Sequence, residues 1–215
     1  MTKEWLTLVG QSYPLSAHAG NPVRFQASGM EFTASRYDAE GFGCVSVMEA
    51  VGMGGAMRME SLILNPFCID APLLSCDRVS AMGAETLNLE MFDSMLSPGF
   101  PFEEQEAAAK AFRDFPDQPF RPCWYDGLRV GTPIVKKTGA QDLEKLEDAL
   151  TGYLEAYLRA CAEAPVCDPE KKRAKAAAYS EGLLEHGGPA TDPVKAAIGE
   201  EATASLFRET LFGTE

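Results

Sequence analysis

The sequence predicts an α/β domain in which an antiparallel sheet carries helices on its faces. Short, alternating apolar segments fill the first half of the chain, glycine and proline separate them, and the second half shows helical spacing. The composition is 46% hydrophobic and 24% charged, as in ordinary globular proteins. Because 215 residues suffice for one sizeable core, we expect a single domain over residues 1–215.

Six segments of the first half are expected to be strands. They lie at 23–27, 31–37, 42–49, 56–64, 73–80 and 85–93. In the last of them, Leu87, Leu89 and Met91 alternate with Asn88 and Glu90, so that one face is apolar. The connections between successive segments are short, which favours an antiparallel meander over parallel crossovers.

The second half is expected to be mainly helical. A short amphipathic helix is predicted over 102–115 and the clearest helix over 140–164, with a loop rich in proline and glycine over about 114–139. Tyr153 and Tyr157 lie on the apolar stripe of the clearest helix, which indicates core positions.

Two cap signatures define the remaining helices. Asp168 followed by Pro169 is typical of an N-cap and a first helical position, and this helix should end at Gly187. Asp192 followed by Pro193 repeats the signature and begins a last helix that continues to about residue 212.

Composition excludes several classes of function. A net charge of -13 opposes binding to nucleic acid, and no apolar run reaches the length of a membrane span. The N-terminal residues do not resemble a signal peptide, so we expect a cytoplasmic protein. With two histidines and no C-x-x-C pair, the chain offers too little material for a zinc site or a Ser-His triad, and we expect no metal.

Two basic clusters interrupt the acidic background. One is Lys136 with Lys137, and the other contains Lys171, Lys172, Arg173 and Lys175. These clusters are either solvated surface or a docking patch for a small acidic partner.

The stretch "NPFCIDAPLLSCDRV" places Asp77 in an apolar strand, where an isolated charge would be costly to bury. A plausible strand pairing puts Arg58, Glu60 and Asp77 on one sheet face. In one interpretation Arg58 forms a buried ion pair with one or both carboxylates. In the other, two close carboxylates cannot both ionise easily, so that one becomes a general acid near pH 7.

The same stretch resembles the core of the ferredoxin-dependent bilin reductases. Asp70, Pro72, Cys76 and Asp77 form a D-x-P-x-x-x-C-D pattern similar to that family's D-L-P turn and the G-x-D of its following strand. By this resemblance the family's catalytic aspartate corresponds to Asp77. Two positions depart from the family: Ser75 replaces the glycine, and Glu60 stands where some members carry a histidine.

The C-terminal stretch "GPATDPVKAAIGEEATASLFRETLF" is similar to the last helix of the same family. Asp192 matches the aspartate of an N-D element near the start of that helix, although the family's tryptophan is absent. The pattern alone makes Asp192 an N-cap, and both roles are compatible.

The resemblance implies a fold, a substrate and a set of roles. The family has a three-layer α/β/α sandwich with a central antiparallel sheet, and its pocket lies between the sheet and the C-terminal helices. It reduces an open-chain tetrapyrrole such as biliverdin through radicals, with no tightly bound cofactor and with electrons from external reduced ferredoxin. Asp77 would be the main proton donor, Glu60 its coupled partner and Asp192 a second donor, while Arg58 and Lys195 would bind propionates. The basic clusters would dock the ferredoxin.

Two alternatives stay open at the level of sequence. The chain would bind a bilin or another tetrapyrrole without reducing it, given the departures at Glu60 and Ser75. Otherwise it is an unrelated small α/β domain with Asp77 and Arg58 as a core ion pair.

Overall fold

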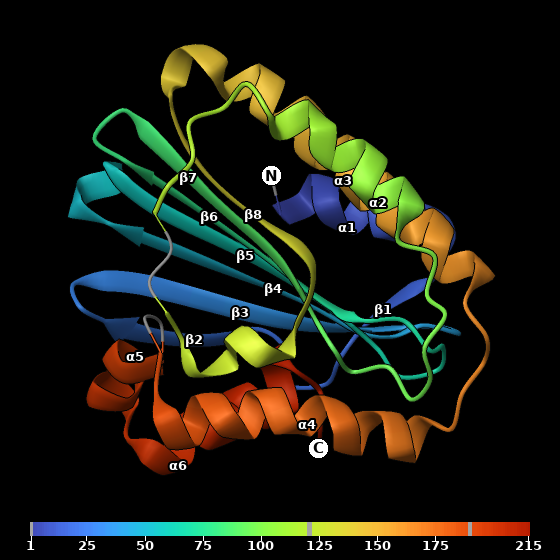
Figure 1. The fold of residues 1–215 in the computed structure, drawn as a ribbon. Helices are drawn as coiled ribbons and strands as arrows, with labels where there is room; N and C mark the ends of the chain where they lie inside the picture. The colour runs from blue at the N-terminus through green and yellow to red at the C-terminus, as the bar shows by residue number, and fades with distance from the viewer. Residues whose placement is uncertain (1, 120–121, 189–190) are drawn as a thin grey trace.

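A central antiparallel sheet with helices on both faces forms the molecule (Figure 1). The structure is a computed structural model that describes residues 2–119, 122–188 and 191–215. The predicted α/β class, with its antiparallel sheet and helical C-terminal half, is confirmed.

The sheet is a meander extended at one edge. Its eight described strands are β1 (Leu15–Ala17), β2 (Val23–Ala27), β3 (Met30–Ala39), β4 (Gly43–Gly52), β5 (Met57–Pro66), β6 (Leu73–Ala81), β7 (Ala84–Phe92) and β8 (Arg129–Gly139). Strands β3 to β8 pair in chain order, and β1 and β2 both pair with β3. Every pairing is antiparallel, as the short connections predicted.

One face of the sheet is covered by helices that all lie before residue 164 in the sequence (Figure 1). These are α1 (Thr2–Ser12), α2 (Glu103–Ala109) with the 3₁₀ turn η2 (Lys110–Phe112), and α3 (Leu143–Glu163), which follows the 3₁₀ turn η4 (Ala140–Asp142). Tyr153 and Tyr157 are buried in this core, as predicted, and the Tyr157 hydroxyl donates to the Pro72 carbonyl at 2.7 Å.

The other face is covered by the C-terminal helices. These are α4 (Pro169–His186), α5 (Thr191–Ile198), α6 (Glu200–Ser205) and the π-helical turn η5 (Leu206–Leu211). The 3₁₀ turn η3 (Trp124–Leu128) packs against α4, and the 3₁₀ turn η1 (Met53–Gly55) joins β4 to β5. As predicted, the Asp168 side chain caps α4 by accepting from the N–H groups of Glu170 and Lys171.

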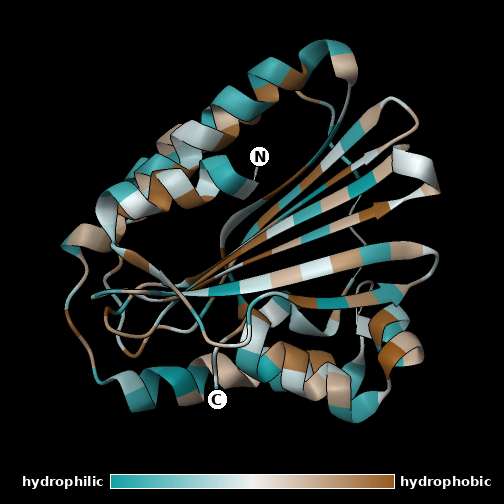
Figure 2. Ribbon diagram, turned by 180° about the vertical axis from the view of Figure 1, so that it is seen from behind, coloured by the Kyte–Doolittle hydropathy of each residue, from teal (hydrophilic) through white to brown (hydrophobic). Residues whose placement is uncertain are grey.

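Alternation along the strands divides side chains between the two cores, and Figure 2 shows it as bands of differing hydropathy. Leu87, Leu89 and Met91 of β7 are buried against α1 and α3. Asn88 and Glu90 point to the opposite face, toward α4 and η5. This face of β7 supplies polar groups to a cavity.

Four elements differ from the prediction. Strand β8 lies in the expected loop over 114–139, and its Pro133 is tolerated because it falls in the irregular part of the β7–β8 ladder, between the paired residues Val130 and Ile134. Helix α1 and strand β1 were not predicted. The expected single last helix is interrupted at Gly199, where a φ of 83° is incompatible with a continuous helix. Among the helices of the described residues, none is long and apolar enough to cross a bilayer.

Candidate active site between the sheet and the C-terminal helices

A cavity of about 160 Å³ lies between the sheet and the C-terminal helices. Its floor is formed by side chains of β4 to β7, and its roof by η3, α4, α5 and η5. Apolar groups such as Met59, Ile63, Val194 and Phe207 line much of it. Polar groups gather on the floor: Ser46, Ser61, Ser75, Asp77, Asn88 and Glu90.

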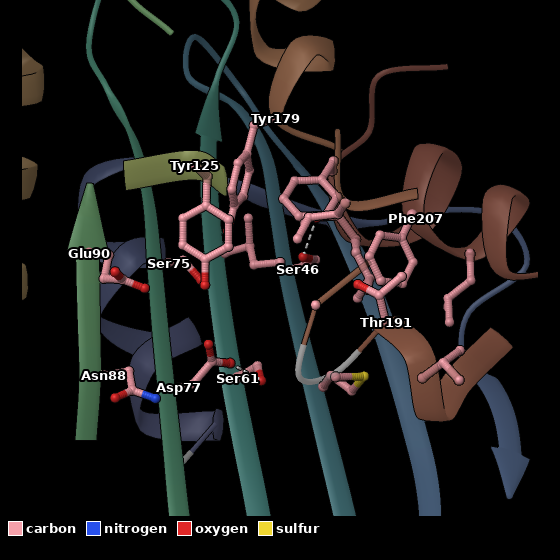
Figure 3. A pocket seen from close by; sticks show the side chains of 18 of the residues that line it. Ser46, Ser61, Ser75, Asp77, Asn88, Glu90, Tyr125, Tyr179, Thr191 and Phe207 are labelled. Atoms are coloured by element: carbon pink, nitrogen blue, oxygen red, sulfur yellow. Dashed lines mark hydrogen bonds between the residues drawn. The ribbon is translucent and has the colours of Figure 1, made fainter. Parts of the chain in front are cut away.

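Asp77 is the central acid of this floor. It lies opposite Ser61 on β5 and opposite Asn88 on β7, and its Oδ1 accepts a hydrogen bond from the Ser61 hydroxyl (Figure 3). Protein surrounds the carboxyl group, and part of the side chain stays open to the cavity. Burial raises the pKa of Asp77 to about 6; the Ser61 hydrogen bond opposes this effect and the nearby Glu90 charge adds to it. A carboxylic acid with this pKa is still partly protonated near neutrality and can donate that proton.

Glu90 is a second carboxylate on the same face. Glu90 on β7 lies opposite Ser75 on the neighbouring strand β6, which makes it a diagonal neighbour of Asp77. The ladder between β7 and β8 is irregular around Glu90, and Arg129, at the start of β8, binds the Glu90 Oε1 through its Nε at 2.5 Å. Irregularities of this kind often occur next to active sites, where they redirect side chains. Here the ion pair with Arg129 holds the Glu90 carboxylate in place beside Asp77.

Aromatic side chains form the roof. Tyr125 stands over the strands with its hydroxyl directed toward the polar floor, and Tyr179 of α4 lies beside it (Figure 3). The two rings meet edge to face at 5.7 Å, and Arg129 lies 4.9 Å from the centre of the Tyr125 ring. Burial raises the pKa of both tyrosines, so their hydroxyls stay protonated and can act as hydrogen-bond donors.

The position of Tyr125 depends on a close contact between η3 and α4. The Trp124 ring packs onto Gly182, where a Cβ would overlap the indole, and the Trp124 Nε1 donates to the Gly187 carbonyl at 3.1 Å. A side chain at residue 182 would displace Trp124 and with it the neighbouring Tyr125.

Arg58 and Glu60 do not lie beside Asp77, and the predicted shared face is wrong. Ser61, not Glu60, is the register partner of Asp77, so Arg58 and Glu60 point to the α1–α3 side. Arg58 is exposed, which also removes the predicted core ion pair with Asp77. Glu60 lies 4.0 Å from Arg78, a buried arginine that also binds carboxylates of neighbouring elements.

Asp192 and Lys195 also lie outside the cavity lining. Asp192 is exposed in the first turn of α5, with its carboxylate beside Gly187, and Thr191 faces the cavity instead. The predicted N-cap role of Asp192 is wrong, because its N–H already donates a helical hydrogen bond to the Gly188 carbonyl at 3.2 Å. The Lys195 amine donates to the Leu184 carbonyl at the end of α4. Its expected contact with a propionate stays a prediction.

The predicted docking clusters are divided between core and surface. Lys136 is buried and binds the Phe115 carbonyl and Asp117, so it is not a surface cation. Lys172 is wholly buried and binds Asp70. The exposed members of the clusters are Lys137, Lys171 and Arg173.

Four pocket residues were not predicted as a site: Ser61, Glu90, Tyr125 and Tyr179. The alternation of β7 already put Asn88 and Glu90 on one face and was the signal that could have found Glu90. Tyr125 lies in a segment without periodicity, and only its contacts with α4 place it. No group of three or more metal-binding side chains occurs within the described ranges.

Comparisons with known proteins give a fold relative. No family model matches the sequence, and no curated protein matches it. Among solved structures, the chain is similar to phytochromobilin synthase from tomato, determined in complex with biliverdin. The TM-score is 0.74 at 13% sequence identity, and the match covers 99% of this chain and 82% of the other. At this identity the similarity concerns the fold.

Proposed function

We propose that this chain binds an open-chain tetrapyrrole such as biliverdin in the cavity and reduces it, with Asp77 as the proton donor. The observation that carries the proposal is an aspartic acid with a pKa of about 6 on the floor of a largely apolar cavity. The fold similarity to a protein determined with biliverdin supports the choice of ligand.

The chemistry requires an acid rather than a resident cofactor. Adding one electron to a conjugated tetrapyrrole produces an anionic radical, and a proton must reach a defined ring atom before the second electron arrives. Reduction of one double bond takes two electrons and two protons. Asp77 gives a proton, the nearby Glu90 charge contributes to its raised pKa, and solvent reloads Asp77. The electrons come from external reduced ferredoxin, as the sequence resemblance implies.

The lining also favours a ligand with N–H donors. Carboxylate and hydroxyl oxygens on the floor accept hydrogen bonds from pyrrole nitrogens, and the aromatic roof offers a stacking surface. No lysine, arginine or histidine occurs among the described lining residues, so the propionates would remain at the solvent side. The volume of about 160 Å³ lies below the range of about 300–1,000 Å³ typical of ligand sites. Tyr125 and Tyr179 therefore turn aside when a tetrapyrrole enters.

Ferredoxin docking is proposed at Lys171 and Arg173, the exposed cations at the start of α4. Electrostatic steering by such cations accelerates association with an acidic partner at low salt. Lys171→Glu with Arg173→Glu should slow ferredoxin-dependent turnover steeply at low salt, whereas Lys137→Glu is the matched exposed control. Unchanged turnover in the double variant would remove this docking site.

A second candidate is a tetrapyrrole-binding protein without reductase activity, which the small cavity and the lack of cations in its lining favour. An anaerobic mixture of protein, biliverdin and a photoreduced ferredoxin distinguishes the two. Loss of the biliverdin absorption, abolished by Asp77→Asn, supports the reductase. A stable bound spectrum without turnover supports the binding protein.

A further inference from the structure

Cys68 and Cys167 face each other where the β5–β6 loop meets the segment before α4. Ile69 and Val166 form an isolated antiparallel bridge between these segments. The Cys167 N–H donates to the Cys68 carbonyl at 3.0 Å, and the Asp70 N–H donates to the Pro165 carbonyl at 2.8 Å. The two cysteines are therefore direct cross-strand neighbours, although 98 residues separate them in the sequence.

This arrangement is compatible with a disulfide. Cys68 and Cys167 share one backbone hydrogen bond, because the Cys68 N–H donates to the Phe42 carbonyl. Opposed residues of an antiparallel pair have Cα atoms about 4.5–5.5 Å apart, and disulfides join Cα atoms about 4.4–6.8 Å apart. The Cys167 Sγ donates to the carbonyl of Phe67 at 3.4 Å, so this thiol is directed at the segment that carries Cys68. Both thiols are half-buried and accessible to a small reagent, whereas Cys44, Cys76 and Cys161 are buried.

A buried ion pair holds the two segments together beside the cysteines. Lys172 is 0% exposed, and its Nζ lies 3.3 Å from the Asp70 Oδ1 and 2.6 Å from the Ala71 carbonyl oxygen. It also binds the Ser94 carbonyl at 2.7 Å. Because α4 cannot move away from the loop without exposing this charge, the two thiols stay close, and such proximity favours an intramolecular step over reaction with a second reagent molecule.

We propose that Cys68 and Cys167 are a redox-active pair that closes to a disulfide when it meets an oxidised low-molecular-weight disulfide such as oxidised glutathione. One cysteine thiolate attacks the reagent and releases one glutathione thiolate, leaving a mixed disulfide. The other cysteine thiolate attacks the protein sulfur of that mixed disulfide and releases the second glutathione. Two electrons pass from the cysteines to the reagent, and the two thiol protons end on the two released glutathione molecules.

The disulfide would join the β5–β6 loop to the start of α4. This helix carries Tyr179 and Leu183 of the cavity roof, so the disulfide would form next to the element that positions the roof. The inference rests on the thiol geometry and not on the proposed function, and its test needs no tetrapyrrole.

The test uses the whole protein, reduced and then incubated with oxidised glutathione. We expect the loss of two free thiols, a Cys68–Cys167 peptide in a non-reducing digest, and a melting temperature higher by about 4–16 °C. Cys68→Ser and Cys167→Ser should each abolish the linked peptide and the temperature shift. Cys123→Ser, at the remaining half-buried cysteine, is the matched control and should keep both.

Three results would overturn the proposal. They are glutathione adducts on both cysteines without a cross-link, a cross-link through another cysteine, and both thiols remaining free. Because differential alkylation of the wild-type chain maps the oxidised residues directly, the decision does not depend on the folding of the serine variants.

Discussion

Asp77→Asn should make the protein more stable at neutral pH and remove one component of its pH dependence. The folded-state pKa of Asp77 is raised from 3.8 to about 6, so the folded chain holds this proton more tightly than the unfolded chain. Below pH 3.8 the Asp77 carboxyl is protonated in both the folded and the unfolded state, so its pKa shift does not reduce the free energy of unfolding. As pH rises through about 6 stability is lost, and at about 1.4 kcal/mol per pKa unit the loss reaches at most about 3 kcal/mol.

The asparagine variant should escape this loss, because its amide oxygen still accepts the Ser61 hydrogen bond and carries no charge. The free energy of unfolding, measured by urea denaturation followed by circular dichroism, should favour the variant by up to about 3 kcal/mol at pH 8 relative to the difference at pH 4. Asp148→Asn, at an exposed site of α3, is the matched control and should leave the pH profile unchanged. Parallel profiles for wild type and Asp77→Asn would refute the assignment of Asp77 as a buried acid.

The remaining predictions concern the neighbours of this site and the ion pair beneath α4. Glu90→Gln should lower the pKa of Asp77, because a charge that favours its protonated form is removed; an unchanged pH profile of stability would contradict the coupling. Tyr125→Ala should speed biliverdin association in stopped-flow absorbance, since the ring no longer has to turn aside, and an unchanged rate would exclude Tyr125 as the barrier. Lys172→Met should destabilise the fold by about 3–5 kcal/mol in urea, because Asp70 loses its ion-pair partner in the interior and keeps only its hydrogen bonds from Leu96 and Ser97; a loss below about 1 kcal/mol would show that the pair is not needed.

The local sequence pattern was sufficient to predict much of the sheet. The alternation of β7 and the apolar run of β6 predict buried strands whose polar interruptions need a partner, and Asp77 was found in this way. The Asp168 cap of α4 was predicted because a capping side chain needs only its own sequence neighbours.

The register between neighbouring strands could not be predicted from the local sequence pattern. The length of the loop between β5 and β6 does not fix which residues of the two strands pair. An error of one residue in the assumed register placed Glu60 where the structure has Ser61. Because strand side chains alternate, that error also moved Arg58 to the wrong face. One interpretation expected a buried arginine, Arg58, paired with carboxylates. A buried arginine does bind several carboxylates, but it is Arg78, and it lies on the opposite face of the sheet.

The burial of two lysines could not be predicted from the local sequence pattern either. Lys172 looks like one member of a charged surface cluster, and only the tertiary arrangement brings Asp70 and two backbone carbonyls to its amine. Lys136 is a similar case, because its partner Asp117 lies in a distant segment. Contacts between distant segments decide which charges of an acidic protein are structural.

The central claim is that the cavity holds an open-chain tetrapyrrole against Asp77. A titration of biliverdin into wild-type protein and into Asp77→Asn, followed by absorbance, tests it most directly. We expect saturable one-to-one binding to both, with a bound spectrum that differs between them because only the wild type offers the Asp77 carboxyl group to the bilin nitrogens. The absence of a saturable shift at high micromolar biliverdin, or identical bound spectra, would contradict the account.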